Sequence, residues 1–325
     1  MNSKRRTLVA ALSLAGVAPS LAFAQEKWPS KPIKILVGFP PGGGADAMAR
    51  LVAAKLPERL GQPVVVENKT GATGTISSDL VAKAAPDGYT LQLAHINSNA
   101  IGPLLVSKGR FDPINDFTPI ALIGITPQML CHHPKHKFRD VPDLIAHAKA
   151  NPGKLSFASS GVGSIQHIAA EAFKLMAGVD LLHVPFKGTG EALAALISGD
   201  VDLTFSSTGS ALPQVNGGKL TLLAVGSPRR LAAFPNVPAI AETLKGYDIS
   251  TWYGLAGPAK MPREVVLRLN AEVQAILKQP DVAKRMKDLD AEVSTGASPE
   301  QFADFWKKEI DKFQKLITEA KIEAA

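Results

Sequence analysis

Two glycine-rich segments are the strongest candidates in the sequence for binding a ligand. Residues 39–46 have the sequence FPPGGGAD, and residues 159–164 have the sequence SSGVGS. Glycine lets the backbone turn tightly and come close to a ligand. A helix that begins after such a turn presents unpaired N–H groups and the positive end of its dipole. We therefore expect both segments to bind an anion through the main chain.

Each segment taken alone also has a simpler explanation. The first lacks the Lys-Ser/Thr pair of a Walker A loop, and the second has Gln166 where the dinucleotide fingerprint has its third glycine. Glycine-rich turns between a strand and a helix often serve packing only. Ser159, Ser160 and Ser164 are each suited to cap the following helix. Packing therefore stays open as an alternative for either segment.

Three further polar segments are weaker candidates. Residues 70–75 (TGATGT) would line the same cleft or form a plain turn. Residues 95–99 (HINSN) follow a predicted strand and offer side-chain donors, and residues 206–208 (SST) hold the equivalent place in the second half of the chain.

Signals for metal binding and hydrolysis are poor. Cys131, His132, His133 and His136 have the chemistry of metal ligands, but neighbouring strand residues point to opposite faces, and two spaced ligand pairs are lacking. The sequence contains neither Gly-x-Ser-x-Gly nor His-Glu-x-x-His. Cys131 is the single cysteine, and its apolar neighbours predict that it is buried. We expect no catalytic residue, no metal and no cofactor.

Predicted strands and helices alternate along the chain and flank the glycine-rich segments. Apolar runs predict strands at 33–37, 64–66 and 90–94, and a second set at 154–158, 180–184, 203–205 and 220–225. Apolar residues at helical spacing lie between them. This order predicts an α/β fold with parallel, helix-covered sheets. Both glycine-rich segments follow the first strand of their own series, at the edge where such sheets bind ligands.

A proline-containing stretch at 118–134 separates the two series and indicates two domains. We expect a second domain over residues 125–251 and a discontinuous first domain over residues 25–124 and 252–325. The C-terminal part carries apolar stripes typical of packed helices. Two such domains that face each other would close on one small anion.

The first 24 residues have the pattern of an export signal. Lys4, Arg5 and Arg6 precede a short apolar run, and Ala22-Phe23-Ala24 is a small-x-small cleavage site. The run is too short to favour an uncleaved membrane anchor. We expect residues 1–24 to be a signal peptide and the mature protein to be periplasmic, with the general and the twin-arginine export routes both open.

The charge balance argues against nucleic acid as a partner. The chain has 36 Lys and Arg against 29 Asp and Glu, which gives +7, or +4 without the three signal-peptide cations. No dense Lys/Arg run follows, and the mild excess would attract anions only weakly.

Seven motifs are spread over residues 28–320. They are residues 35–46 (ILVGFPPGGGAD), 84–91 (AAPDGYTL), 150–155 (ANPGKL), 159–164 (SSGVGS), 183–188 (HVPFKG), 235–238 (PNVP) and 252–255 (WYGL). Each is unspecific alone, but together they resemble the Bug family, the substrate-binding proteins of tripartite tricarboxylate transporters.

The resemblance implies a two-lobed periplasmic binding protein of the Venus flytrap, type II-like class, in which each lobe is a mostly parallel sheet covered by helices. It implies that a small organic carboxylate is held in the interdomain cleft by backbone amides, hydroxyls and bridging waters. The chain would then deliver this ligand to the membrane permease of a tripartite tricarboxylate transporter. We expect it to act as a monomer.

Two positions depart from the family pattern. Many members carry an acidic residue where this chain has Ser206, which weakens the expectation of an amino-acid ligand. The loop after Asn68 commonly carries proline where this chain has Thr70, so the pocket shape is expected to differ there.

We expect the ligand to be lined mainly by backbone groups of the two glycine-rich segments, and Asp46 to stabilise the first helical turn instead of holding the anion. The predicted ligand-binding residues are Phe39, Pro41, Gly42, Gly43, Ala45, Asp46, Gly71, Ala72, Asn97, Ser160, Gly161, Val162, Gly163, Ser164, Lys187, Gly188 and Ser206. Alternatives are a ligand-sensing subunit for a signalling partner and, with less support, a secreted hydrolase or a degenerate oxidoreductase. An activated Ser–His pair in the cleft would favour the hydrolase.

Overall fold

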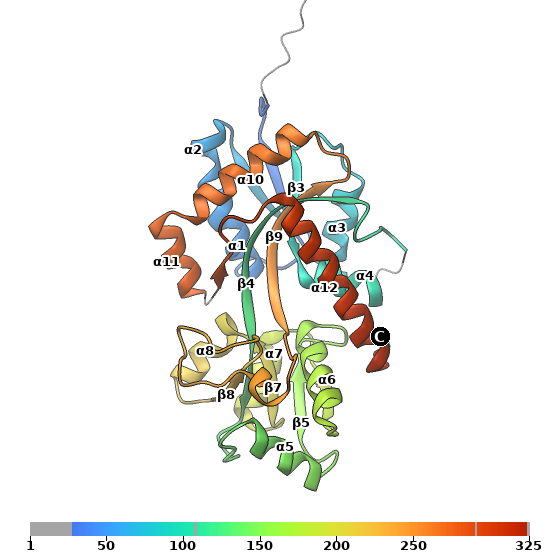
Figure 1. Cartoon of the computed structure of the whole chain (residues 1–325), viewed down its shortest axis with the longest axis vertical. Coiled ribbons are helices and arrows are strands. Elements are labelled where there is room, and N and C mark those ends of the chain that lie inside the picture. Colours follow the sequence, from blue (N-terminus) through green and yellow to red (C-terminus); the bar gives the residue numbers. More distant parts are fainter. Residues whose placement is uncertain (1–27, 107–108, 290, 324–325) are drawn as a thin grey trace, which may run out of the picture.

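The computed structural model describes residues 28–106, 109–289 and 291–323. Two lobes are stacked along the long axis of this part of the chain, and strands β4 (Phe117–His132) and β9 (Ser250–Pro258) run from one into the other (Figure 1). The predicted signal peptide, residues 1–24, lies outside the described residues.

The first lobe is built on three parallel strands. Strand β1 (Ile33–Val37) lies between β2 (Val64–Asn68) and β3 (Thr90–His95). Antiparallel β9 continues the sheet beside β3, and the first part of β4 pairs with β9 and with the short β10 (Glu292–Val293). The helices of this lobe are α1 (Gly44–Ala53), α2 (Leu56–Leu60), α3 (Thr75–Ala82), α4 (Gly102–Leu105), α10 (Arg263–Leu277), α11 (Pro280–Asp288) and α12 (Pro299–Glu319), with a 3-10 turn (Ala72–Gly74) and a π turn (Asn97–Ile101).

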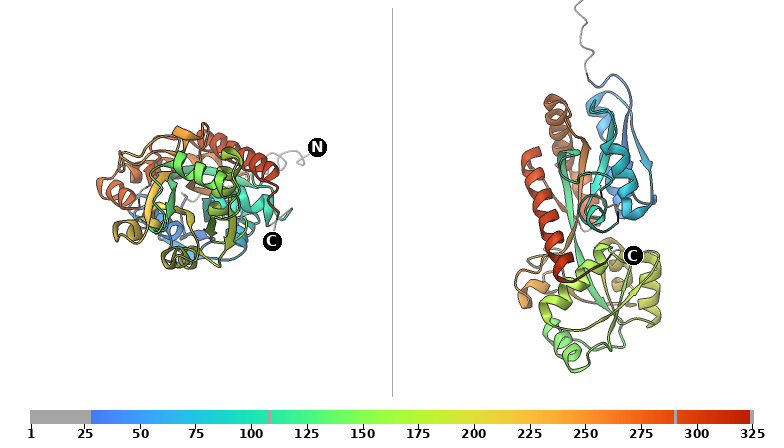
Figure 2. Two further views of the ribbon diagram at one scale, coloured as in Figure 1. Left: turned by 90° about the horizontal axis from the view of Figure 1, so that it is seen from below. Right: turned by 90° about the vertical axis from the view of Figure 1, so that its right-hand side faces the viewer.

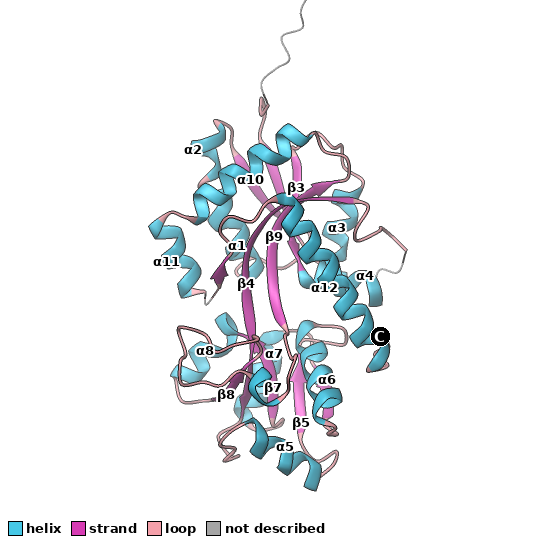
Figure 3. Ribbon diagram, in the orientation of Figure 1, coloured by secondary structure: helices cyan, strands magenta, loops and turns pink. Residues whose placement is uncertain are grey.

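The second lobe repeats this plan. Strand β5 (Ser156–Ser159) lies parallel between β6 (Leu182–Pro185) and β7 (Leu203–Ser207). The last part of β4 pairs antiparallel with β7 and with β8 (Thr221–Val225). Figure 3 shows these strands enclosed by helices. The helices are α5 (Val141–Ala150), α6 (Ile165–Ala177), α7 (Thr189–Ser198), α8 (Thr208–Asn216) and α9 (Ile240–Thr243).

The seven predicted strands are confirmed to within a few residues, but β4, β9 and the short β10 were not predicted. The stretch at 118–134, interpreted as a separator, is strand β4 and belongs to both lobes. Its prolines and the glycines of β9 obscure the strand pattern. The predicted domain boundaries fall inside β4 and β9, so they would cut the two crossing strands, and they stay a prediction.

Helix α12 runs along one side of the first lobe, and its C-terminal part reaches α6 of the second lobe (Figure 2). Its N-terminus has a capping box, because the Ser298 side chain accepts from the N–H of Gln301 and the Gln301 side chain accepts from the N–H of Ser298. The buried side of the helix carries Phe302, Trp306 and Phe313, and these residues share one hydrophobic cluster with residues of α6 in the second lobe. Packing against α12 is therefore continuous across the junction of the lobes.

Among the described residues, none of the helices has the length and apolar character needed to cross a bilayer.

Candidate functional site

A cavity of about 530 Å³ lies between the lobes, at the carboxyl ends of the parallel strands. Its first wall comes from the first lobe and comprises Phe39, Pro40, Gly43, Gly44, Ala45, Thr73, His95 and Asn97. Its second wall comes from the second lobe and comprises Ser160, Ser164, Ile165, Gln166, Lys187, Gly188, Thr189, Ser207 and Ser210. Its floor is formed by Gln128, Thr251 and Tyr253 of the two crossing strands.

Four helices begin at this cavity. Their N-cap residues are Gly43 for α1, Ser164 for α6, Gly188 for α7 and Ser207 for α8, and all four line the cavity. Figure 1 shows α1 in one lobe and α6, α7 and α8 in the other. Only the α6 cap makes a side-chain hydrogen bond to the helix N-terminus, so the first N–H groups of the other three helices have no such acceptor. Unpaired N–H groups and dipole ends of one sign make this an anion site.

Asp46 holds the first glycine-rich loop from behind. Its carboxylate accepts hydrogen bonds from the Gly42 N–H (3.0 Å), from Arg50 Nε (2.8 Å) and from Asn68 Nδ2 (2.9 Å). Asn68 Nδ2 also donates to the Phe39 carbonyl at 2.9 Å. The Arg50 hydrogen bond is the main reason why the pKa of Asp46 falls to about 2. Asp46 therefore fixes the loop as a buried anion and lies outside the cavity lining.

The second glycine-rich loop is fixed by side chains beneath it. The Ser160 N–H donates to Gln166 Oε1 at 2.6 Å, and the Gly163 N–H donates to His167 Nδ1 at 3.2 Å. Gly161 and Gly163 have φ values of 120° and 74°, which an L side chain rarely adopts. The loop therefore needs glycine at both positions, and its shape is set before any ligand arrives.

Two stacked histidines lie under the same loop. The rings of His167 and His183 are 4.0 Å apart, and Phe157 stacks beneath His183. Burial lowers the pKa of His167 to about 3 and that of His183 to about 4, so both rings are neutral. His183 Nε2 lies 2.7 Å from Ser159 Oγ, but Ser159 is fully buried and neither residue lines the cavity. This Ser–His pair supports the loop and presents no nucleophile to the cavity.

The floor and the adjacent wall are polar but uncharged. His95 lies between the rings of Phe39 and Tyr253, and burial lowers its pKa to about 3. Its Nδ1 accepts from the Asn97 N–H at 3.0 Å, so the ring proton is on Nε2. Among the described residues that line the cavity, Lys187 is the only one with a charged side chain. Anion binding here depends on the main chain far more than on ion pairs.

The cavity brings together eight of the sequence-predicted residues and leaves nine outside its lining. The eight are Phe39, Gly43, Ala45, Asn97, Ser160, Ser164, Lys187 and Gly188. The nine are Pro41, Gly42, Asp46, Gly71, Ala72, Gly161, Val162, Gly163 and Ser206. Some of these shape the loops, and Ser206 lies buried behind Gln166, whose Nε2 is 3.3 Å from its hydroxyl. Ligand contact by any member of either group stays a prediction.

Sequence reasoning missed the floor of the cavity. Gln128, Thr251 and Tyr253 were not proposed as site residues, and neither were Gln166, Thr189 and Ser210 of the second wall. A signal for the floor exists, because Gln128 and Thr251 interrupt apolar runs that are otherwise buried. Polar residues inside buried strands require a partner, which a ligand cavity supplies.

Other chemically suggestive groups are occupied by structural contacts. His136 Nε2 lies 2.7 Å from the Asp202 carboxylate, and within the described ranges no cluster of His, Cys, Asp and Glu is arranged to hold a metal ion. Cys131 is fully buried, as predicted, and burial raises the pKa of its thiol to about 12. The thiol is therefore unreactive.

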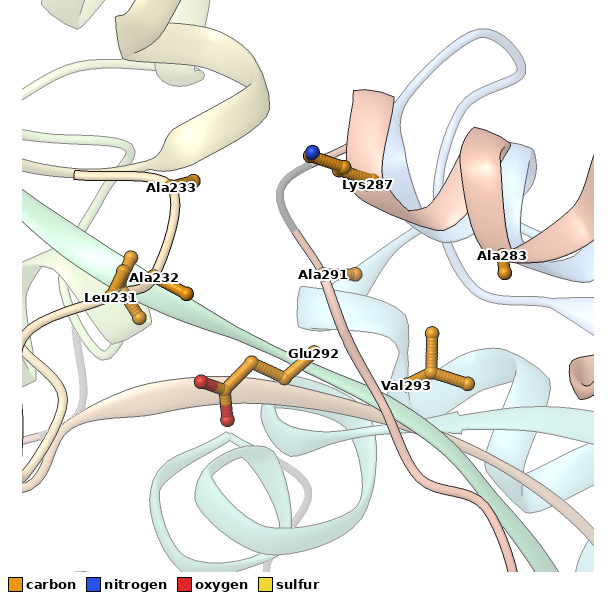
Figure 4. Close-up of a pocket in the computed structure, with 8 residues that line it drawn as sticks. All are labelled: Leu231, Ala232, Ala233, Ala283, Lys287, Ala291, Glu292 and Val293. Atoms are coloured by element: carbon orange, nitrogen blue, oxygen red, sulfur yellow. The ribbon is translucent and has the colours of Figure 1, made fainter. Parts of the chain in front are cut away.

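A second pocket, of about 220 Å³, also lies between the lobes and is mostly apolar. Figure 4 shows side chains of residues 231–233 facing Ala291, Glu292, Val293 and the end of α11. Alanine side chains form much of it, and no helix N-terminus is among its lining residues. Its chemistry is unlike that of the main cavity.

The chain was compared with protein families, curated proteins and solved structures. The family model that describes the tripartite tricarboxylate transporter family receptor matches residues 48–322. A UPF0065 protein from the tcbD–tcbE intergenic region of Pseudomonas sp. (strain P51) is 39% identical over 99% of this chain and 96% of its own length. Protein BugT of Bordetella pertussis is 33% identical over 98% of both chains.

Solved structures give the same result. Rpa4515 of R. palustris, solved with adipate, has a TM-score of 0.82 and 33% identity, covering 92% of this chain and all of that one. MatC of Rhodopseudomonas palustris, solved with bound malate, has a TM-score of 0.78 and 33% identity, covering 89% of this chain and 99% of that one. These matches confirm the two-lobed binding-protein fold. As its Bug-like motifs predicted, this protein belongs to the tripartite tricarboxylate transporter receptor family.

Proposed function

We propose that this protein is a periplasmic receptor that captures a small organic carboxylate between its lobes and delivers it to the membrane permease of a tripartite tricarboxylate transporter. The observation that carries the proposal is the convergence of four helix N-termini on one cavity. The family provides the receptor role, and the cavity provides the ligand class.

The physical basis is a positive potential that comes mainly from helix N-termini, because Lys187 is the single cation among the described lining residues. A helix N-terminus acts as roughly half an elementary charge, and its interaction with an anion is worth about 0.3–1 kcal/mol, or more where water is partly excluded. The N-termini lie on opposite walls, with α1 in the first lobe and the other three in the second. A bound carboxylate would therefore attract both walls and favour closure.

The solved relatives support the ligand class. Rpa4515 was solved with adipate and MatC with malate, and both are carboxylates. The family role supports delivery to a permease, to which closure would present a changed surface. We propose in addition that the protein acts as a monomer. The predicted signal peptide supports a periplasmic location.

The proposal is tested by thermal unfolding of the purified protein against carboxylates, with amines and sugars as controls. The protein is first unfolded and refolded to remove any ligand carried through purification. At a hundred times its Kd, a true ligand adds about 2.7 kcal/mol of stability, which raises Tm by roughly 4 °C for a chain of this size. The proposal is wrong if no carboxylate raises Tm while an amine or a sugar does.

A matched pair of variants tests the helix N-termini directly. Gly43 has ordinary extended backbone angles, and an added Cβ would lie 3.7 Å from its nearest neighbour, so Asp and Asn both fit as N-caps of α1. The two differ only in charge. Gly43→Asp should bind the best carboxylate at least tenfold more weakly than Gly43→Asn, because it adds an anion to the site. Equal affinities, measured by calorimetry, would rule out anion binding at this N-terminus.

A further inference from the structure

Gln128 is a buried glutamine at the floor of the cavity, and the oxygen of its side-chain amide accepts no hydrogen bond from the described residues. It lies in β4, is fully buried and lines the cavity. Its Nε2 donates to Thr251 Oγ1 of β9 at 3.0 Å. Its Oε1 is buried and has no hydrogen-bond partner among the described residues. The carbonyl end of this amide therefore lacks the donor that a buried oxygen needs, and a ligand group that reaches it from the cavity would supply one.

The main chain holds Gln128 firmly in place. The Gly226 N–H donates to its carbonyl oxygen at 2.7 Å, and the residue pairs with Ser207 in the sheet of the second lobe. Gly226 packs so closely that an added Cβ there would lie 3.4 Å from the Gln128 Cβ. The main chain and Cβ of Gln128 are therefore fixed at the floor of the cavity.

The first lobe contributes a second buried carbonyl oxygen without a partner among the described residues, on another residue that lines the cavity. Asn97 lines the cavity, and its Oδ1 is buried without a hydrogen-bond partner among the described residues. The residues that line the cavity thus carry two kinds of hydrogen-bonding group. Helix N-termini offer N–H groups, whereas Gln128 and Asn97 offer acceptors that need a donor.

We propose that Gln128 is a specificity-determining residue whose Oε1 accepts a hydrogen bond from a hydroxyl group of the ligand, so that the preferred ligand is a hydroxylated carboxylate. This inference rests on the proposed function. A methylene group at that position would leave a buried carbonyl oxygen unpaired, and a second carboxylate would be repelled by it. An ammonium group would meet positive helix ends and no carboxylate among the described lining residues. A hydroxyl group meets the acceptor without either penalty.

The test compares members of one carbon skeleton, chosen as the skeleton that stabilises the protein most in the thermal screen. For a five-carbon diacid these are 2-hydroxyglutarate, 3-hydroxyglutarate, 2-oxoglutarate and glutarate. For a four-carbon monoacid they are the corresponding butyrates. We expect one hydroxy acid to bind at least tenfold more tightly than the unsubstituted and oxo acids, as measured by calorimetry. Tenfold corresponds to about 1.4 kcal/mol.

Two variants assign this preference to Gln128. Gln128→Met keeps the length and volume of the side chain but removes the acceptor, so the preference for the hydroxy acid should fall to threefold or less. Gln166→Met changes a glutamine in the same cavity whose Oε1 already accepts from the Ser160 N–H. It should weaken the hydroxy and unsubstituted acids by the same factor and leave their ratio unchanged.

The outcomes separate this inference from the proposed function. If no carboxylate binds, the proposed function fails and the inference fails with it. If carboxylates bind but hydroxy and unsubstituted acids are equal, only the role of Gln128 is wrong. A preference for the oxo acid would also overturn it, because it would show that Gln128 donates to the ligand. A hydroxyl preference that persists in Gln128→Met would assign the acceptor to another residue.

Discussion

Charged side chains form little of the cavity lining. Asp46 lies outside the lining and contributes by holding the first glycine-rich loop in place. It belongs to the first glycine-rich segment, yet it lies behind the loop and binds Gly42, Arg50 and Asn68. The sequence predicted that Asp46 would stabilise the first turn of a helix, because acidic residues favour that position. The bond to Asn68 depends on the pairing of β1 with β2 and could not be predicted.

Asp46→Asn should lower the free energy of unfolding by about 2 kcal/mol at neutral pH, because a buried carboxylate with charge-assisted hydrogen bonds is replaced by a neutral amide. The pKa of Asp46 is lowered from 3.8 to about 2. Its contribution to the free energy of unfolding is therefore complete above pH 3.8 and is lost as the pH falls through about 2. The difference between wild type and variant should therefore shrink at about pH 3, as measured by urea denaturation.

Asp143→Asn is the matched control. Asp143 also pairs with an arginine four residues away, Arg139, and also accepts from a backbone N–H, but this pair is exposed. Its loss should lower the free energy of unfolding far less than the loss of Asp46, because solvent screens the exposed pair. Equal effects of the two substitutions would show that Asp46 does not hold the loop.

At the scale of elements, a glycine in β9 allows α12 to pack closely against the strand. Gly254 faces Phe302 of α12, and an added Cβ would clash with the Phe302 ring and lie 3.0 Å from the Ala121 carbonyl oxygen. Close approach of this kind requires glycine, although glycine weakens a strand. The β/α series were predictable because their apolar runs are short and regular. Strands β4 and β9 were not, because prolines and glycines interrupt their patterns.

Gly254→Ala should destabilise the protein by about 1–3 kcal/mol, because the added methyl group overpacks the contact between β9 and α12. Denaturant unfolding measures this change. Gly190→Ala is the control, since Gly190 lies in α7 with nothing within 4 Å of an added Cβ, and alanine favours a helix. An unchanged stability of Gly254→Ala would mean that α12 does not pack tightly on β9.

At the scale of the whole molecule, the two lobes are joined by two crossing strands and by the packing of α12. Strand β4 pairs with partners in both lobes, and the cavity lies across the junction. The two-lobed arrangement was predictable from two β/α series with a glycine-rich loop each. The floor of the site was not, because Gln128 and Thr251 are 123 residues apart in the sequence and meet only when β4 and β9 come together.

Saturation with the best carboxylate should reduce the radius of gyration, because a ligand held by both walls stabilises the closed arrangement. Small-angle X-ray scattering measures the change. At a ligand concentration equal to the wild-type Kd, the Gly43→Asp variant should show a smaller reduction than Gly43→Asn. An unchanged radius in the wild-type protein at saturation would exclude closure of the lobes as the response to binding.

The four helix N-termini at the cavity also determine how such a receptor can diverge. Their N–H groups belong to the main chain, so most substitutions leave the carboxylate clamp intact, and only a change that shifts the backbone or adds an opposing charge removes it. The floor would behave differently, because Gln128, Thr251 and Tyr253 would contact a ligand through their side chains. Duplicated copies of this gene can therefore acquire new ligands by single substitutions in the floor while they retain the ability to bind a carboxylate.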